Sequence, residues 1–571
     1  MTGSIWMLHA KKADFNALSG RFHISPVTAR IIRNRDIESE AEFDRYLNGS
    51  LEDLYSPGLL PDMEEAVQRI CRAVQEKRRL RIVGDYDIDG VCSTAILYKG
   101  FKRIGACADY VIPERIRDGY GINEHIIEAA AADGIQTIVT CDNAIAAISQ
   151  IALAKELGLE VIITDHHDIQ TNEETGEDLM PPADVIVNPK RRDSLYPFPD
   201  ICGGMVAYKL VQVLYEVHKI PGEEWLGLLE IAAIATVGDV MKLQGENRII
   251  VKEGLSRLEH TSNLGLRKLI EKNNLQAGSI TAYHIGFVIG PCLNAGGRLK
   301  SAKIALRMLL AETPEQAGGF ADELKELNDM RKDMTAKGEA EAIEQVENKY
   351  MDDKVLVVFL PECHESLAGI IAGRLREHFN KPSFVLTRGE TMAKGSGRSI
   401  EQYHMYQGLC GVADLLAKFG GHPMAAGLSL EEKNIDEFRR QLNAKADLSA
   451  EDFVPRIWID VPMPFEYVNE KIVQELKELE PFGQGNEKPL FAQKGLMIRN
   501  SRVLGKNRNV VKMNLVTDTG HPVDGLLFTD GDRFLDEQAG RNLIDMIYYP
   551  DVNEYNGTRT LQAVIKNYKF H

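Results

Sequence analysis

The sequence has no apolar run long enough to cross a membrane, and its cysteines are few and scattered. A membrane-spanning helix needs about 20 consecutive apolar residues. The stretch MTGSIWMLHAKKADF at the N-terminus lacks the apolar core and the small-residue cleavage site of a signal peptide. None of the 8 cysteines forms a C-x-x-C pair, which argues against a disulfide framework and against a structural zinc site. We therefore expect a protein of the reducing cytoplasm that has no membrane partner.

Positive charge is also in short supply. The 67 Lys and Arg residues are outnumbered by 84 Asp and Glu residues, so the formal net charge is −17. Such a balance normally counts against a nucleic-acid partner, but a local basic channel can exist on an acidic protein. The sequence contains no internal repeat and no low-complexity tract, which leaves ordinary globular domains. A chain of 571 residues is too long for one hydrophobic core, and we expect about three or four domains.

Short β-rich runs alternate with helical runs in the first half of the chain. The strand candidates are residues 80–84, 137–141, 161–164 and 185–188. Strand–helix alternation of this length predicts parallel βαβ units and a doubly wound sheet. In such sheets, ligands bind at the carboxyl ends of the strands.

The rest of the chain divides into three further units. Residues 315–349 are highly charged and free of proline, which predicts a long, largely exposed connecting helix. A second α/β unit follows over residues 350–447. Alternating polar and apolar residues over 456–571 predict a small all-β domain of the barrel type. The expected fold class is therefore α/β, in which residues 1–314 hold an N-terminal segment and the first α/β domain.

Acidic residues follow the predicted strands of the first α/β domain. Asp85, Asp87 and Asp89 lie within five positions, directly after residues 80–84. Like charges about 4 Å apart repel by roughly 4 kcal/mol at an effective dielectric constant near 20. A folded chain that collects them at the end of a buried strand therefore needs a cation there.

Later strands and helices add further residues that can bind metal: Asp142, Asp165, His166, His167 and Asp239. Carboxylates with a few imidazoles are the ligand set of Mn²⁺ or Mg²⁺ rather than of a zinc–thiolate site. A single Asp after a strand is more often a helix N-cap, and we interpret Asp85 as structural. Because four such positions recur in one α/β domain, we predict a centre for two divalent ions.

The motifs DYDIDG, CDNAIAA, TDHH and TVGDVMKL resemble the four motifs of the DHH phosphoesterase superfamily. Five later motifs resemble those of the RecJ family of single-stranded-DNA exonucleases, including its DHHA1 and OB-fold domains. They are GPCLNAGGRL, HESLAGIIAGRL, GSGRS, GGHPMAAGLSL and LEPFGQGNEKPLF. The resemblance extends from about residue 30 to the C-terminus.

The resemblance implies a role for each site residue. The metal ligands would be Asp87, Asp89, Asp142, His166 and Asp239. Asp142, Asp165 and His167 would be catalytic, where Asp165 orients His166 and His167 faces the scissile phosphate. The substrate phosphates would be held by Arg115, Arg298, Arg374, Ser396, Arg398 and His422.

The sequence departs from the family pattern at one position. The family usually has glycine after the Asp-Asn pair, whereas this chain has Ala144. If that position needs a positive φ, alanine costs on the order of 1 kcal/mol and could shift Asp142. We expect the substitution to be tolerated because every expected ligand is retained.

The resemblance implies a two-metal-ion exonuclease that hydrolyses single-stranded DNA from 5′ to 3′ into 5′-mononucleotides, in DNA repair and recombination. It also implies a monomer whose partners are a helicase and a single-strand-binding protein. One alternative is a DHH phosphodiesterase of short oligonucleotides or cyclic dinucleotides, which would not need the C-terminal β domain. A pyrophosphatase would not need it either. A catalytically silent DNA-binding scaffold would normally show broken ligands, and here none is missing.

Overall fold

A five-stranded parallel sheet forms the first α/β domain in the computed structural model, which describes residues 3–172, 175–555 and 557–571. The strand order is β3 (Cys107–Val111), β2 (Arg79–Val83), β4 (Thr137–Cys141), β5 (Glu160–Thr164) and β6 (Val185–Val187). All neighbouring strands are parallel, which confirms the predicted doubly wound sheet. The sequence reading missed β3, an edge strand. The chain reverses its direction of winding between β2 and β4, where such sheets bind ligands.

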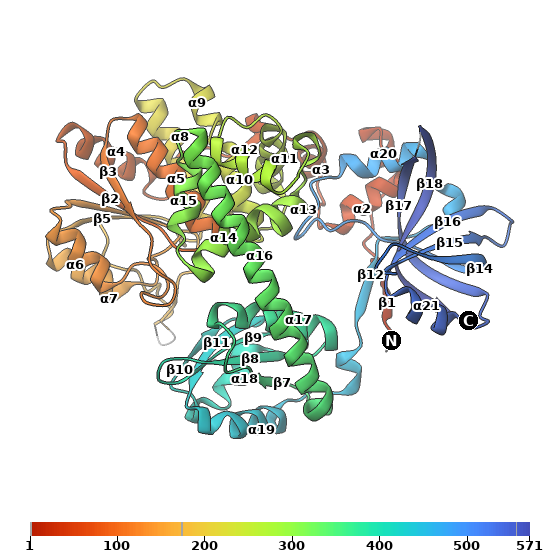
Figure 1. The fold of residues 1–571 in the computed structure, drawn as a ribbon. Coiled ribbons are helices and arrows are strands. Elements are labelled where there is room, and N and C mark those ends of the chain that lie inside the picture. The colour runs from red at the N-terminus through yellow and green to blue at the C-terminus, as the bar shows by residue number, and fades with distance from the viewer. Residues whose placement is uncertain (1–2, 173–174, 556) are drawn as a thin grey trace.

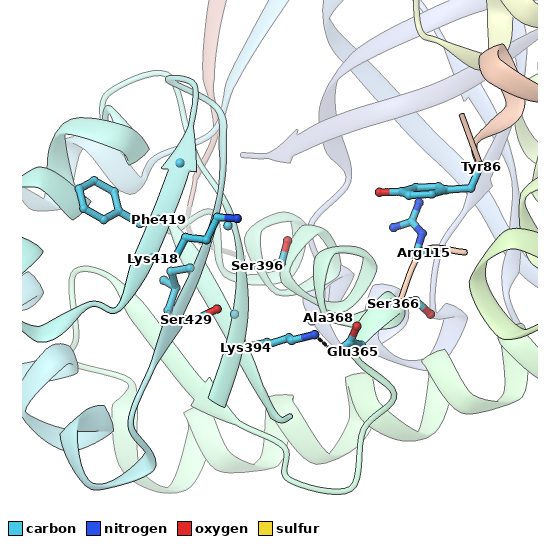
Figure 2. A pocket seen from close by; sticks show the side chains of 14 residues that line it. Tyr86, Arg115, Glu365, Ser366, Ala368, Lys394, Ser396, Lys418, Phe419 and Ser429 are labelled. Carbon is cyan, nitrogen blue, oxygen red and sulfur yellow. Dashed lines mark ion pairs between the residues drawn. The ribbon is translucent and has the colours of Figure 1, made fainter. Parts of the chain in front are cut away.

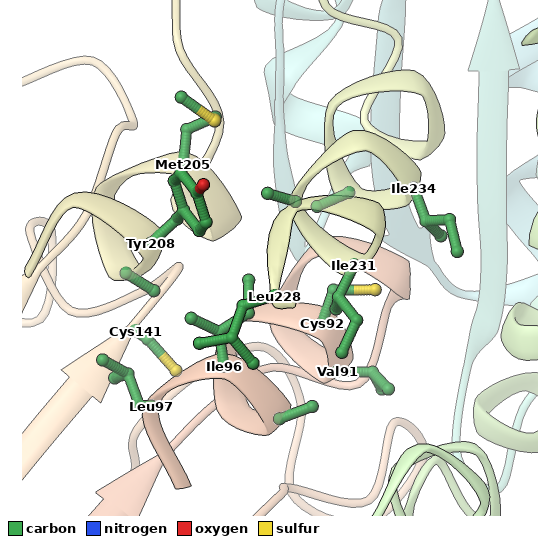
Figure 3. Packing of buried hydrophobic residues seen from close by; sticks show 14 of the residues in the cluster. Val91, Cys92, Ile96, Leu97, Cys141, Met205, Tyr208, Leu228, Ile231 and Ile234 are labelled. Atoms are coloured by element: carbon green, nitrogen blue, oxygen red, sulfur yellow. The ribbon is translucent and has the colours of Figure 1, made fainter. Parts of the chain in front are cut away.

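Helices cover both faces of this sheet, so its strands other than the edge strand β3 are largely buried. The nearby helices are α4 (Met63–Gln75), α5 (Ile88–Arg103), α6 (Glu124–Ala132), α7 (Ile148–Glu156) and α8 (Gly203–Val217). One core holds Ile82 and Val139 together with α5, α8 and α10 (Leu229–Gly238). Figure 3 shows side chains of these three helices interlocking, among them Ile96, Met205 and Ile231. Because α10 is apolar on all sides, it is buried, and its end places Asp239 beside the sheet.

A helical layer leads from this domain to the next. Its helices are α9 (Gly222–Leu226), α11 (Gly245–Leu258), α12 (Leu264–Lys272), α13 (Ala282–His284), α14 (Gly290–Leu299) and α15 (Lys303–Leu309). The predicted connecting helix corresponds to α16 (Pro314–Gln345), which starts at a Thr313 cap that accepts the N–H of Gln316. Figure 1 shows α16 running from the first domain to the second. This helix therefore links the two α/β domains.

The second α/β domain has a mixed sheet. Its strand order is β10 (Lys418–Gly421), β11 (Ala425–Leu430), β9 (Ala393–Arg398), β8 (Ser383–Arg388) and β7 (Leu356–Phe359). The pair β7–β8 is parallel and the other pairs are antiparallel. The accompanying helices are α17 (Ala368–Phe379), α18 (Met405–Cys410) and α19 (Ile435–Lys445).

The C-terminal domain is the predicted barrel. Its strands are β13 (Val461–Pro462), β14 (Phe491–Leu504), β15 (Val510–Val516), β16 (Pro522–Phe528), β17 (Leu543–Tyr555) and β18 (Thr558–Phe570). The sheet closes because β14 pairs with both β15 and β17. Helices α20 (Glu470–Glu478) and α21 (Gly531–Gln538) flank it.

The first helices of the N-terminal segment share a core with the barrel, whereas Leu51 and Leu54, which follow them, pack against the adjacent α/β domain. Strand β1 (Ile5–Leu8) pairs with β12 (Arg456–Ile459). Helices α1 (Phe15–Phe22), α2 (Pro26–Asn34) and α3 (Glu40–Asn48) share a core with the barrel, in which Ile31 and Phe43 accompany Phe491. The predicted boundary at residue 314 stays a prediction.

Within the described residues, no helix combines the length and apolar character needed to cross a bilayer.

Candidate metal centre and adjoining cleft

The turn from β2 into α5 positions the first pair of carboxylates. Asp87 caps α5 and accepts the N–H of Gly90 at 3.0 Å. The start of α8, which is distant in sequence, donates the N–H groups of Gly203 and Gly204 to Asp89, each at 2.7 Å. A Cβ atom on Gly203 would lie 2.7 Å from the Cβ of Asp142. Glycine is therefore required where α8 meets the carboxylates.

The loop after β4 positions Asp142 through an unusual backbone. Asp142 has φ +61° and Ala144 has φ +90°. Between them, the buried Asn143 side chain donates to the carbonyl groups of Val83 and Cys141 at 3.0 and 2.8 Å. Position 144 thus has the positive φ that favours glycine, and alanine is strained there.

His166, directly after β5, lies at the centre of the cluster. Its Nε2 is 3.1 Å from Asp142 Oδ1 and 3.6 Å from both Asp89 Oδ2 and Asp239 Oδ2. Potential ligand atoms lie within 4.8 Å of one another in two groups that share His166: Asp142 with His166 and His167, and Asp89 with His166 and Asp239. Side chains from four separate chain segments therefore converge.

The electrostatics of the cluster fit a divalent cation. Burial, together with neighbouring carboxylates, raises the pKa of Asp89, raises that of Asp142 further and raises that of Asp239 to about 8. Burial lowers the pKa of His166, so its imidazole is neutral and able to bind metal, and its Nδ1 has no hydrogen-bond partner among the described residues. A neutral imidazole among buried carboxylates is a donor set for Mn²⁺ or Mg²⁺.

Two further carboxylates lie beside these groups. The charge of Asp87 contributes to the raised pKa values of its neighbours, but its own carboxylate lies outside both groups. Asp85 is fully buried, and its Oδ1 accepts the N–H of Gly121 at 3.1 Å, which agrees with the structural interpretation.

Asp165 holds His167 rather than His166, which corrects the prediction for this residue. Its Oδ1 lies 2.7 Å from His167 Nδ1, and its Oδ2 accepts the N–H of Ile145. It reaches His166 through the backbone N–H alone. The ring of His166 lies beside that of His167, with ring centroids 4.5 Å apart, but its Nε2 is directed at Asp142, Asp89 and Asp239 instead of Asp165. Burial lowers the pKa of His167, but Asp165 and then Asp239 outweigh burial and raise it to about 9.

A cavity of about 530 Å³ adjoins the centre, between the two α/β domains. Figure 2 shows Tyr86 and Arg115 on one wall and Lys394, Ser396 and Lys418 on the other. The Arg115 guanidinium lies 4.1 Å from the centroid of the Tyr86 ring. The structure thus brings one predicted phosphate ligand from each domain to the same cavity.

Two other predicted phosphate ligands lie next to this cavity. Arg298 donates from Nη1 to the carbonyl oxygen of Ser366 in the facing domain at 2.8 Å. Arg398 donates to Ser396 Oγ at 3.3 Å. Burial and the cations Arg115 and Arg331 lower the pKa of Arg298 to about 10. The cluster therefore carries uncompensated positive charge, which suits a polyanion.

Three family models match the chain: the DHH family N-terminal domain over residues 79–236, the DHHA1 domain over 352–447 and the RecJ OB domain over 459–567. The single-stranded-DNA-specific exonuclease RecJ of Bacillus subtilis (strain 168) is 35% identical and is aligned over 98% of this chain and 70% of its own length. That of Salmonella typhimurium is 32% identical over 95% of each chain. The chain belongs to the RecJ family.

A solved RecJ structure from Thermus thermophilus, in complex with Mn²⁺, matches this fold. Its TM-score is 0.83 at 28% identity, and the match covers 99% of this chain and 79% of that chain. A second structure, of exonuclease RecJ bound to manganese, has a TM-score of 0.60 at 32% identity and covers 69% of this chain and 96% of that chain. Those RecJ structures hold a cation of the class that the donor set here fits.

Tyr120 is a site residue of this RecJ-family chain that the sequence reading missed. Its hydroxyl donates to the Asp142 carbonyl oxygen at 2.9 Å and lies 3.1 Å from His167 Nε2. Gly119 and Gly121 flank it with φ +78° and +69°. This Gly-Tyr-Gly pattern was the available signal, since two such glycines indicate a tight loop that presents the residue between them.

Two predicted phosphate ligands are placed less directly in this RecJ-family structure. Arg374 is exposed on α17, forms a 3.8 Å ion pair with Glu377, and is not among the described residues lining the cavity. His422 lies close enough to the first domain to affect Asp168, whose pKa is lowered mainly by Lys190 and also by His422.

Proposed function

We propose that this chain is a divalent-metal-dependent exonuclease that degrades single-stranded DNA from the 5′ end to 5′-mononucleotides, in DNA repair and recombination. The observation that carries the proposal is the convergence of His166 with Asp89, Asp142 and Asp239. Its relatives in Bacillus subtilis and Salmonella typhimurium are described as single-stranded-DNA-specific exonucleases.

The residues that would hold the ions are Asp87, Asp89, Asp142, His166 and Asp239. When bound, Mn²⁺ or Mg²⁺ neutralises this cluster, polarises the phosphodiester and makes water a better nucleophile. His167 supplies a second source of positive charge, because its contact with Asp165 raises its pKa. A protonated imidazole held by Asp165 can donate to a phosphate oxygen as negative charge develops there.

A second cavity, of about 1220 Å³, is lined in part by Gly238 and Val240, the sequence neighbours of Asp239. Its lining also includes Lys566 of the barrel. Tyr283 and Phe287 in this lining are 62% and 67% exposed, and their rings stack at 4.7 Å. The bases of a single strand stack on exposed aromatic rings, and its phosphates are attracted to basic residues. The long strand therefore enters along this cavity from the barrel.

Release of mononucleotides requires the 5′ end to lie one nucleotide beyond the metal centre. In the proposed arrangement, the smaller cavity receives this end, because the predicted phosphate ligands Arg115 and Ser396 line it. Ser396 and Arg398 are the polar side chains there that can hold the terminal phosphate, because their hydroxyl and guanidinium groups meet at the cavity wall.

The larger cavity and the barrel favour a long strand over the alternative substrates, a cyclic dinucleotide or pyrophosphate. A silent scaffold is disfavoured because all five expected ligands are present. Partnership with a helicase and a single-strand-binding protein, a monomeric state and a cytoplasmic location belong to the same proposal. The family resemblance supports the partners and the monomeric state. The absence of C-x-x-C pairs supports the cytoplasmic location.

The test incubates the protein and Mn²⁺ with labelled single strands, duplexes, dinucleotides and pyrophosphate. We expect long single strands to be degraded from the 5′ end, and Asp142→Ala to abolish this degradation. The matched control is Asp193→Ala, which removes a carboxylate that is exposed and paired with Arg191 outside the centre. Cleavage confined to dinucleotides or pyrophosphate, or full activity in Asp142→Ala, would refute the proposal.

A further inference from the structure

Three polar side chains form a row, here called the lysine row, across the sheet of the second α/β domain. Lys394 on β9 is in register with Ser429 on β11, and Ser429 is in register with Lys418 on β10. Residues in register project to the same face of a sheet, and all three line the smaller cavity. Lys394 pairs with Glu365 at 2.8 Å, whereas in the described part of the chain no ion pair involves Lys418. The row therefore has a surplus of positive charge.

In the neighbouring row, two glycines leave the backbone exposed to the cavity, and we call this surface the glycine floor. Ser396 is in register with Gly427, and Gly427 with Gly420. A Cβ on Gly420 would meet no described atom within 4 Å, and one on Gly427 would come no closer than 3.9 Å to anything. Neither glycine has a positive φ. Since neither packing nor backbone conformation requires glycine here, the missing side chains leave room for a ligand against the strands.

Two members of the lysine row lie farther than Ser396 from the cavity wall that the first domain provides (Figure 2). In Figure 2, Lys418 and Ser429 lie on the side of Ser396 opposite to Tyr86 and Arg115. Rows two residues apart along a strand are separated by about 7 Å. A ligand whose phosphate is held at Ser396 can therefore extend over the glycine floor to the lysines.

We propose that Lys394, Ser429 and Lys418 bind one further phosphate group, beyond the phosphate held by Ser396 and Arg398. This inference deepens the proposed function and rests on it. The further phosphate has two possible sources with the same chemistry. It belongs either to a 5′-triphosphate end or to one more nucleotide of a strand that has moved past the metal centre, which would then be released as a dinucleotide.

Glu365 sets the strength of this subsite. Its carboxylate occupies Lys394 and would repel an incoming phosphate, so the phosphate must compete for that lysine. We expect Glu365→Gln to favour substrates that carry the further phosphate. A purely structural ion pair would instead affect all substrates alike.

The experiment compares cleavage of oligothymidines that differ only in bearing a 5′-monophosphate or a 5′-triphosphate, and also measures product length. We expect the full-length protein to cut the triphosphate strand within about threefold of the monophosphate strand, or to release dinucleotides along with mononucleotides. In the double variant Lys394→Gln/Lys418→Gln, the triphosphate-to-monophosphate ratio of kcat/KM falls by about tenfold or the dinucleotides disappear. Glu365→Gln changes the same readout in the opposite direction.

Two further variants separate binding from folding. Gly427→Ala adds a methyl group to the floor without a protein clash, so we expect an unchanged melting temperature and a lower ratio. Lys433→Gln is the matched control, because that lysine pairs with Glu431 on the same domain outside the cavity. If the monophosphate strand is cut but the double variant leaves both the ratio and the product lengths unchanged, the subsite is refuted. Failure to cut the monophosphate strand at all would refute the proposed function instead.

Discussion

The two α/β domains that face each other across the cleft build their sites in opposite ways. The first domain gathers carboxylates and imidazoles at the ends of β2, β4 and β5, together with the end of α10. The second domain spreads two serines and basic side chains over the face of β9, β10 and β11. The parallel sheet therefore offers a cluster of negative charge at its edge, and the mixed sheet offers positive charge on its surface.

This difference follows from strand direction. In a parallel sheet, all carboxyl ends lie at one edge, so residues that follow successive strands must come together. In an antiparallel sheet, residues meet when they are opposite one another on one face. Lys394 and Lys418 meet through Ser429 for this reason, although they are far apart along the chain. The first kind of site can be read from local sequence, whereas the second depends on register.

Substitutions of the two adjacent histidines test the carboxylate and imidazole site of the first domain, and we expect them to have the largest effect. We expect His166→Ala to weaken Mn²⁺ binding on the order of 100-fold, because its Nε2 faces three carboxylates. His167→Gln should retain most of the Mn²⁺ affinity but lower kcat by about 100-fold, because it loses a charge near the phosphate. Calorimetric titration with Mn²⁺ and single-turnover kinetics measure the two effects. Equal losses of Mn²⁺ affinity in both variants would show that the histidines do not have separate roles.

Two arginines of the second domain test the other half of the comparison, the basic site of the mixed sheet. Arg398 donates to Ser396 at the cavity wall, whereas Arg374 is exposed and pairs with Glu377. We expect Arg398→Gln to raise KM for single strands by about tenfold. Arg374→Gln should change it by less than about threefold. Neither variant should affect Mn²⁺ binding. A larger effect of Arg374→Gln on KM would contradict the expected difference between Arg398, at the cavity wall, and Arg374, on the exposed side of α17.

The pH dependence of stability tests the charge of the carboxylate cluster. The pKa values of Asp89, Asp142 and Asp239 are raised in the folded protein, that of Asp239 to about 8. The metal-free folded state thus binds protons more tightly than the unfolded state, and this contribution to stability is lost as pH rises toward 8. Mn²⁺ should therefore raise the melting temperature more at about pH 8.5 than at about pH 6. Thermal unfolding in Mn²⁺ and in a chelator gives the difference, and a larger increment at the lower pH would contradict the cluster charge.

Ala144 gives the smallest expected effect. Because its φ is +90°, we expect Ala144→Gly to raise the free energy of unfolding by on the order of 1 kcal/mol. Mn²⁺ affinity should change by only a few-fold, since Asp142 keeps its contacts with His166. Denaturant unfolding and Mn²⁺ titration provide the two numbers. A large gain in Mn²⁺ affinity would mean that alanine displaces Asp142 in the natural chain.

The sequence reading picked candidate metal ligands in the first domain because they lie just after predicted strands or a buried helix. It missed Tyr120 because that residue lies on a loop held by Asp85 and Asn143, both distant in sequence, which accept the N–H groups of Gly121 and Ile122. It assigned Asp165 to the wrong imidazole, because two adjacent histidines cannot be told apart until the ring directions are known. Arg374 lies in a motif but on an exposed face of α17.

The sequence alone determined which candidate metal ligands the chain carries, their order along the chain, the parallel sheet and the barrel. These features are local, since periodicity and strand-end residues are set by neighbours a few positions apart. Only the tertiary structure decided that α1 to α3 pack on the barrel, which imidazole Asp165 holds and which lysines share a row. Such contacts join residues far apart along the chain, and their pairing depends on how complete sheets and domains pack against each other.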